Sequence, residues 1–119
     1  MAAEVKNFGS PDETRPFEGK GQAKAVELAG HTVLEGTFEP GWKWSQNVKP
    51  LAGTDTCQVA HFGYVLSGSM KVYMDDGTEI ELNAGDVVAI PPGHDAEVTG
   101  PETCVMVDFG EIGDYAKRS

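Results

Sequence analysis

The chain has 119 residues and a formal net charge of −10, with 39% hydrophobic and 24% charged residues. This size and composition suit one globular domain. The strong negative charge argues against binding to nucleic acid or to an anionic membrane surface, because both require a basic footprint. No apolar run approaches the roughly 20 residues that a membrane-spanning helix needs.

The first segment, residues 1–20, is polar and contains two prolines; its large apolar side chains are Phe8 and Phe17. We predict an extended N-terminal arm here and a single barrel domain over residues 21–119. The segment lacks the apolar core of a signal peptide, so we expect a cytoplasmic protein. The two cysteines, Cys57 and Cys104, are then expected to be reduced.

Short apolar runs separated by glycine and proline turns follow this arm. Such spacing is typical of strands in β-sandwiches and barrels. The sequence Asp75-Asp76-Gly77 is a strong hairpin signal, because glycine readily takes a positive φ. We predict about nine strands, over residues 22–28, 32–38, 42–48, 57–66, 69–74, 78–82, 86–90, 95–99 and 103–109. Residues 51–56 are expected to form a loop, and residues 112–118 a short C-terminal helix or tail.

Residues 61–93 resemble the core of a cupin, a small jelly-roll barrel. The sequence YVLSG, followed by a strand and an Asp-Gly turn, is similar to the end of the first cupin motif. Gly85, five further residues and then Pro91-Pro92-Gly93 match the opening of the second motif, G-x5-P-x-G. The resemblance extends to short bacterial cupins. It implies an all-β, antiparallel jelly-roll barrel that forms a homodimer.

Cupins usually bind a divalent metal through three histidines and one glutamate, so the resemblance implies a metal site inside the barrel. Counting back from Gly68 places His61 at the glutamate position. In the second motif the histidine position holds Ala96, and His94 lies two residues earlier. The His-x-His positions of the first motif fall on Asn47 and Lys49, or on Asp55 and Cys57.

His94 shares a strand face with position 96, because side chains two apart point the same way. Its Cα would still be displaced by about 6.6 Å along the strand. Two interpretations of His94 follow. It is a turn residue bonded to nearby backbone or to Asp95, or it belongs to the pocket because the turn after Pro92 brings it back.

His61 shares one face of its predicted strand with small and apolar side chains, which favours a position in the barrel interior. The alternative is a core histidine bonded to a carbonyl or hydroxyl group. Four strand residues would place Cys57 about 13 Å from His61. A shared metal is therefore not expected unless the strand begins later than residue 57. The side chains that we expect to line the pocket are Val59, Val65, Trp44, Met106 and Cys57.

Two functions remain open for this barrel. In the first, His61 and His94 hold a divalent ion (Zn, Ni, Mn or Fe) that acts on a small molecule. Further ligands could come from Asn47, Gln58 or Asp55, or from Asp108 on the last strand. In the second, the pocket binds a small organic ligand without a metal, as a binding or sensing module. The sequence leaves open whether the protein is an enzyme.

Overall fold

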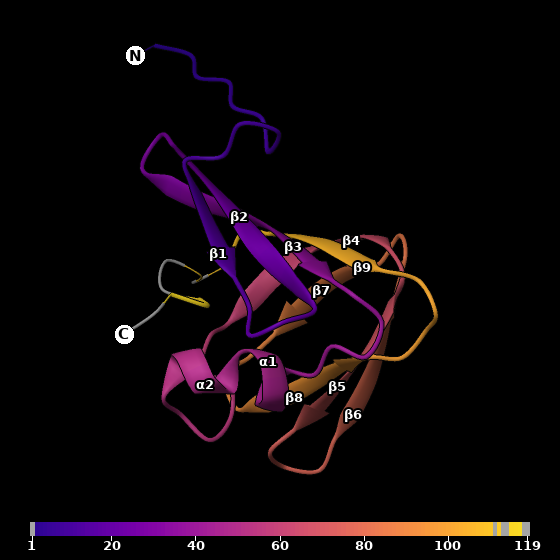
Figure 1. Ribbon diagram of the computed structural model, residues 1–119. Helices are drawn as coiled ribbons and strands as arrows, with labels where there is room; N and C mark the ends of the chain where they lie inside the picture. The colour runs from indigo at the N-terminus through magenta and orange to yellow at the C-terminus, as the bar shows by residue number, and fades with distance from the viewer. Residues whose placement is uncertain (1, 111, 113–114, 118–119) are drawn as a thin grey trace.

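The computed structural model describes residues 2–110, 112 and 115–117. In these residues the chain forms nine β-strands and two short helices, and the strands make two antiparallel sheets (Figure 1). The predicted all-β antiparallel class is therefore confirmed. The expected C-terminal helix lies partly outside the described residues; Tyr115 and Ala116 form a turn. Within the described part of the chain, no helix is long and apolar enough to cross a membrane.

The larger sheet has six strands in the order β1-β2-β3-β9-β4-β7. Its strands are β1 (Glu13–Pro16), β2 (Gly21–Leu28), β3 (His31–Phe38), β4 (His61–Ser67), β7 (Val87–Ile90) and β9 (Cys104–Asp108). Strand β1 falls within the predicted N-terminal arm and pairs with β2. Just after it, Phe17 is buried in the core, so this part of the arm packs on the barrel.

The smaller sheet has three strands in the order β6-β5-β8. They are β5 (Ser69–Met74), β6 (Glu79–Asn83) and β8 (His94–Val98). The predicted hairpin joins β5 to β6, and Gly77 has the positive φ (91°) that such a turn requires. Buried residues alternate along β5 and β8, as expected for strands with one face on the core.

Residues 42–48 do not form the predicted strand. The structure has two helical turns instead, α1 (Trp44–Asn47) and α2 (Lys49–Ala52), which lie beside β8 in Figure 1. Asp95 on β8 accepts the backbone N–H of Ser45 (3.1 Å), and the Asn47 side chain accepts that of Lys43 (3.0 Å). These bonds satisfy backbone donors at the start of α1. The alternation of large and polar residues from Trp42 to Val48, on which the predicted strand rests, carries no information about these bonds.

Strand β4 begins four residues later than predicted, at His61 rather than residue 57. Residues before it turn toward the start of β8, where Cys57 forms an isolated bridge with His94. The Cys57 N–H donates to the His94 carbonyl (2.8 Å), and the Gly93 N–H donates to the Cys57 carbonyl (2.7 Å). Gly93 has a φ of 92°, and a Cβ there would lie 2.9 Å from an Asp75 carboxylate oxygen. Glycine is therefore required for the turn that places His94.

Candidate functional site

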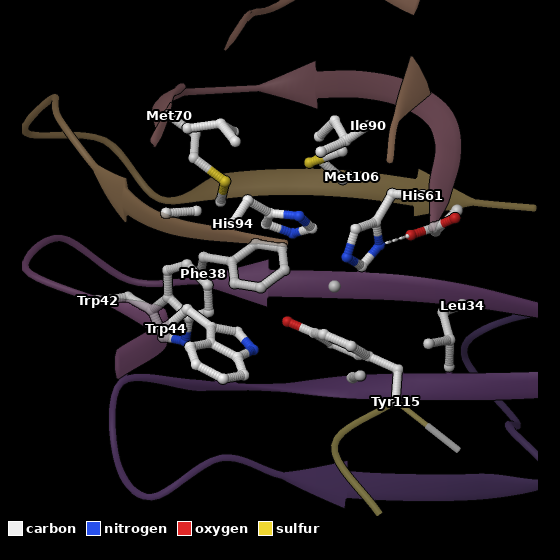
Figure 2. Close-up of a pocket in the computed structure, with 15 residues that line it drawn as sticks. Leu34, Phe38, Trp42, Trp44, His61, Met70, Ile90, His94, Met106 and Tyr115 are labelled. Carbon is white, nitrogen blue, oxygen red and sulfur yellow. Dashed lines mark hydrogen bonds and ion pairs between the residues drawn. The ribbon is translucent and has the colours of Figure 1, made fainter. Parts of the chain in front are cut away.

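Three potential metal ligands meet inside the barrel. One ligand atom from each of Cys57, His61 and His94 lies within 4.8 Å of the others. Cys57 Sγ is 3.6 Å from His61 Nε2, and the two imidazole centroids are 5.2 Å apart. Cys57 and His94 are buried, and His61 is nearly so. Figure 2 shows both histidine rings beside the same interior space.

The three residues reach this point from separate elements. His61 opens β4 in the larger sheet, His94 opens β8 in the smaller sheet, and Cys57 is held to His94 by their backbone bridge. The expected separation of about 13 Å between Cys57 and His61 is wrong, because it assumed one continuous strand. The displacement of His94 by two residues is offset by the left-handed turn at Gly93.

Both imidazoles are oriented by their Nδ1 atoms. His61 Nδ1 lies 2.5 Å from Asp108 Oδ2, and His94 Nδ1 lies 2.9 Å from the Pro91 carbonyl oxygen. A carboxylate or a carbonyl can only accept, so each histidine donates its Nδ1–H and turns Nε2 away from that partner. Metal-binding histidines almost always donate their second N–H in this way. The arrangement therefore matches what a metal site requires.

Asp108 is itself fixed by the backbone. Its Oδ1 accepts the N–H groups of Phe62 (3.2 Å) and Gly110 (2.9 Å), which leaves Oδ2 for His61. The sequence offered Asp108 as a possible metal ligand on the last strand. In the structure it is a hydrogen-bond partner of His61, and it is not among the three clustered ligands.

Burial and mutual contacts shift the pKa values of the clustered residues. Burial disfavours the Cys57 thiolate, but its hydrogen-bond interactions with His61 and His94 outweigh burial and lower the pKa of Cys57 to about 6. Burial likewise disfavours the imidazolium of His61, yet hydrogen bonds to Asp108 and Cys57 raise its pKa to about 9. Burial raises the pKa of Cys104 to about 11. At neutral pH Cys57 is therefore the thiolate, the form of cysteine that binds metals.

An inner cavity adjoins the cluster between the two sheets. Its volume is about 40 Å³, measured as the space that the centres of water-sized molecules can occupy. Its walls include His61, His94 and Tyr115. Most of the remaining lining is apolar and comes from both sheets, including Leu34, Phe38, Met70, Val72, Ile90 and Met106. Trp44 and Tyr115 border this cavity and also an outer pocket of about 400 Å³, which Cys57 lines. They therefore form the wall between the two spaces.

The residues expected to line the pocket are distributed between these spaces. Trp44 and Met106 line the inner cavity. Cys57, Val59 and again Trp44 line the outer pocket. Val65 is fully buried in the apolar core and is not among the residues lining either space.

The three further ligand candidates have other partners. The Asn47 amide donates to the Glu18 carbonyl (2.6 Å), and its oxygen accepts from Lys43. The Gln58 amide donates to the hydroxyl oxygen of Thr56 (2.9 Å). Asp55 is fully exposed and lies 3.6 Å from the ammonium group of Lys49. The structure places none of the three in the ligand cluster found among its described residues.

Tyr115 is a polar residue of the site that no sequence pattern indicated. Its ring centroid lies 5.2 Å from that of His61, and Figure 2 shows its hydroxyl directed into the cavity. Burial raises the pKa of this hydroxyl well above 10. The segment around it was predicted as a helix or tail, and nothing in its pattern indicates that it returns to the barrel interior.

Comparisons with known proteins agree with this architecture. The family model described as "Cupin domain" matches residues 55–110, which include all three clustered ligands. KdgF from a Halomonas species has a TM-score of 0.62 and 21% identity, with 93% of this chain and 94% of that chain covered. An RmlC-like cupin from Shewanella frigidimarina has a TM-score of 0.61 and 21% identity, with 92% of each chain covered.

A protein with a double-stranded β-helix domain from Klebsiella pneumoniae is equally similar, with a TM-score of 0.61, 20% identity, and 96% and 94% coverage. At such identities the likeness concerns the fold alone. A comparison with curated proteins finds no match. Residues 55–110 therefore match the cupin domain model, and the chain as a whole shares the barrel fold of the solved cupin structure.

Proposed function

We propose that this protein binds one divalent transition-metal ion through Cys57 Sγ, His61 Nε2 and His94 Nε2. The observation that carries the proposal is the orientation of the two imidazoles. Each donates Nδ1–H to a fixed acceptor, and their ligand atoms lie within 4.8 Å of each other and of the thiolate. Thiolate and imidazole ligands suit zinc, iron or nickel, whereas manganese prefers oxygen ligands.

Three protein ligands leave a coordination position for a small molecule, as in catalytic zinc sites. A metal ion at this point supplies a Lewis acid that polarises an oxygen of the bound molecule. The chain's own residues prepare the site: Asp108 fixes the His61 ring, and the Gly93 turn fixes His94. The apolar walls of the cavity limit access of water. The proposed function is therefore metal-dependent binding or conversion of a small molecule.

The second candidate function is binding of a small organic molecule without a metal. It is favoured by the charge balance of the cluster, because a Cys57 thiolate beside a His61 imidazolium forms an ion pair without any added ion. Asp108 then stabilises the imidazolium from its other side. In this case the inner cavity is the binding site, and the cluster provides a polar wall.

Elemental analysis and metal titration of the purified protein distinguish these two functions. The first predicts one equivalent of Zn²⁺, Fe²⁺ or Ni²⁺ bound by the wild type and lost in Cys57→Ser and His61→Ala. His31→Ala and Cys104→Ser are matched controls, because His31 is exposed and Cys104 is buried outside the cluster. Absence of metal, together with no thermal stabilisation by any of these ions, contradicts the first function, since binding to the native state must stabilise it.

We further propose that the protein forms a homodimer through the outer face of β4 and β7. Phe62, Tyr64 and Leu66 alternate on β4 and are 57%, 41% and 49% exposed. Val87, opposite Tyr64 on β7, is 72% exposed. Among the described strands β7 is an edge strand of the larger sheet, so no further strand flanks the apolar face on that side. A second copy can therefore pack against this face. Light scattering tests this: Phe62→Asp should give a monomer, whereas a monomeric wild type contradicts the proposal.

A cytoplasmic location also belongs to the proposed function. Both cysteines of the protein are free, and a thiolate ligand requires a reduced thiol. Reducing conditions of this kind are those of the cytoplasm. Fractionation of cells that express the protein tests the location, and recovery outside the cytoplasm contradicts it.

A further inference from the structure

We propose that Tyr115 limits the size of the molecule that reaches His61 and His94, and that Arg15 on β1 holds Tyr115 in place. The inference deepens the proposed function and rests on it for the choice of site, because it concerns access to the same two histidines. It does not require a bound metal ion, since its evidence comes from the packing around the cluster.

The candidate site lies between two spaces of very different size. His61 and His94 line the inner cavity of about 40 Å³, whereas Cys57 lines the outer pocket of about 400 Å³. An apolar protein cavity that binds benzene has a volume of about 150 Å³. The inner cavity is therefore too small for a ring of this size, and the outer pocket is large enough. The wall between them decides which molecules reach both histidines.

Tyr115 is the part of this wall that contacts a histidine. Trp44 and Tyr115 are the two described residues that line both spaces. The Tyr115 ring packs edge-on against His61, with 5.2 Å between the ring centroids and 85° between the ring planes. Figure 2 shows its hydroxyl directed into the inner cavity. Displacing this ring would join the two spaces beside His61.

The two wall residues are held in different ways. Trp44 belongs to helix α1, where Asp95 accepts the backbone N–H of Ser45. Tyr115 lies in a turn, in which its N–H donates to the carbonyl oxygen of Ile112 (3.1 Å). A turn lacks the repeated backbone hydrogen bonds of a sheet. The position of Tyr115 therefore depends on contacts between this turn and the rest of the barrel.

Arg15 supplies polar contacts that hold this turn. Its Nη1 donates to the carbonyl oxygens of Ile112 (3.1 Å) and Tyr115 (2.9 Å). Its Nε donates to the Glu13 carboxylate (2.6 Å), and all four residues of β1 pair with β2. Arg15 is 4% exposed, and a buried charge is costly unless hydrogen bonds compensate it. Charged donors also form the stronger hydrogen bonds.

The role of Arg15 is therefore positioning. Its side chain lines neither the inner cavity nor the outer pocket, so it acts on access through Tyr115. This contact gives the N-terminal arm a part in the site, because β1 lies within that arm. Losing the guanidinium should free the Tyr115 ring to leave the wall without changing any residue that contacts the bound molecule.

Benzene titration of protein labelled with ¹³C at the methionine methyl groups tests the inference. Met70 and Met106 line the inner cavity, and Met74 is an internal control because it lines neither space. We expect no saturable shift in the wild type or in Tyr115→Phe, which keeps the ring. Arg15→Gln should raise the affinity for benzene at least tenfold, with nuclear Overhauser contacts from benzene to both inner methyl groups. This variant removes no atom of the cavity wall, so the gain must come from displacement of Tyr115.

Val88→Ala is the matched control for general loosening of the core, because Val88 is buried outside both spaces. It should exclude benzene as the wild type does. Benzene binding by the wild type, or equal binding by Val88→Ala and Arg15→Gln, overturns the inference. Exclusion by folded Arg15→Gln refutes the role of Arg15, and exclusion by Tyr115→Ala refutes the size limit. If Arg15→Gln does not fold, Arg15→Lys replaces it, with a smaller gain expected because lysine lacks the forked donor.

The titration is repeated after treatment with a chelator, which separates this inference from the metal proposal. The same pattern of benzene binding is expected with and without an ion. A protein that binds no metal but admits benzene in Arg15→Gln supports the size limit and contradicts the metal site. A protein that binds metal but excludes benzene in both Arg15→Gln and Tyr115→Ala contradicts the size limit alone.

Discussion

Replacing Asp108 with asparagine tests whether the carboxylate orients a metal ligand. Asp108 Oδ1 holds the backbone N–H groups of Phe62 and Gly110, while Oδ2 accepts from His61. An asparagine that keeps its oxygen toward the two backbone groups turns its NH₂ toward His61 Nδ1. Two donors then face each other. His61 must move its proton to Nε2, which removes the lone pair that would bind the metal.

The expected loss follows from the burial of this pair. Removing such a partner of a metal-binding histidine typically weakens metal binding about 10–100-fold, or about 1.4–2.7 kcal/mol. The side chains of His61 and Asp108 are only 11% and 10% exposed, so water replaces the carboxylate poorly. We therefore expect a loss in the upper half of the range, about 30–100-fold. The pKa of His61 should fall and that of Cys57 should rise.

Competition titration against a chromophoric chelator measures this loss. Asp86→Asn is the matched control, because its carboxylate also accepts a backbone N–H (Asn83, 2.7 Å) but lies outside both cavity linings. The control should bind metal as the wild type does. If Asp108→Asn also binds as tightly as the wild type, the carboxylate does not orient His61 for metal binding and the reasoning is refuted.

Three further predictions concern protonation and the turn at Gly93. In metal-free protein the thiolate absorbance of Cys57 should rise as pH increases through about 6, because the interactions of Cys57 with His61 and His94 outweigh burial. This transition should be absent in Cys57→Ser and retained in Cys104→Ser. Metal uptake near pH 7.5 should release about one proton, since His61 must lose the proton that its pKa of about 9 retains; uptake without proton release, followed with a pH indicator, argues against ligation by His61. Gly93→Ala should destabilise the protein by about 1–2 kcal/mol in urea unfolding, because alanine is strained at a φ of 92°, and unchanged stability contradicts a required left-handed turn.

The barrel could be predicted because its signals are local. Alternating apolar residues and turn glycines such as Gly77 place strands β2 to β9 within a few residues, whereas β1 lies in the segment expected to be an extended arm. The strand predicted over 42–48 failed for a reason that is not local. Trp42 and Trp44 are both buried, as their spacing indicates, but the first helical turn is fixed by Asp95 on a distant strand.

The candidate site could be predicted only in part. His61 and His94 stood out because the cupin motifs lead to them, and the structure brings both to the cavity. Cys57 joins them because its backbone pairs with His94 at the start of β8 and does not continue strand β4. That pairing depends on a contact between residues far apart in the chain, which strand periodicity does not contain. The return of Tyr115 to the cavity is equally remote from any sequence pattern.

The visible and near-ultraviolet spectrum of the cobalt(II)-substituted protein tests the central claim most directly. The account predicts one equivalent of bound cobalt with a thiolate-to-cobalt charge-transfer band. This band should disappear in Cys57→Ser and persist in Cys104→Ser, because Cys57 alone of the two belongs to the ligand cluster. Absence of the band in the wild type, or its persistence in Cys57→Ser, would contradict a metal centre formed by Cys57, His61 and His94.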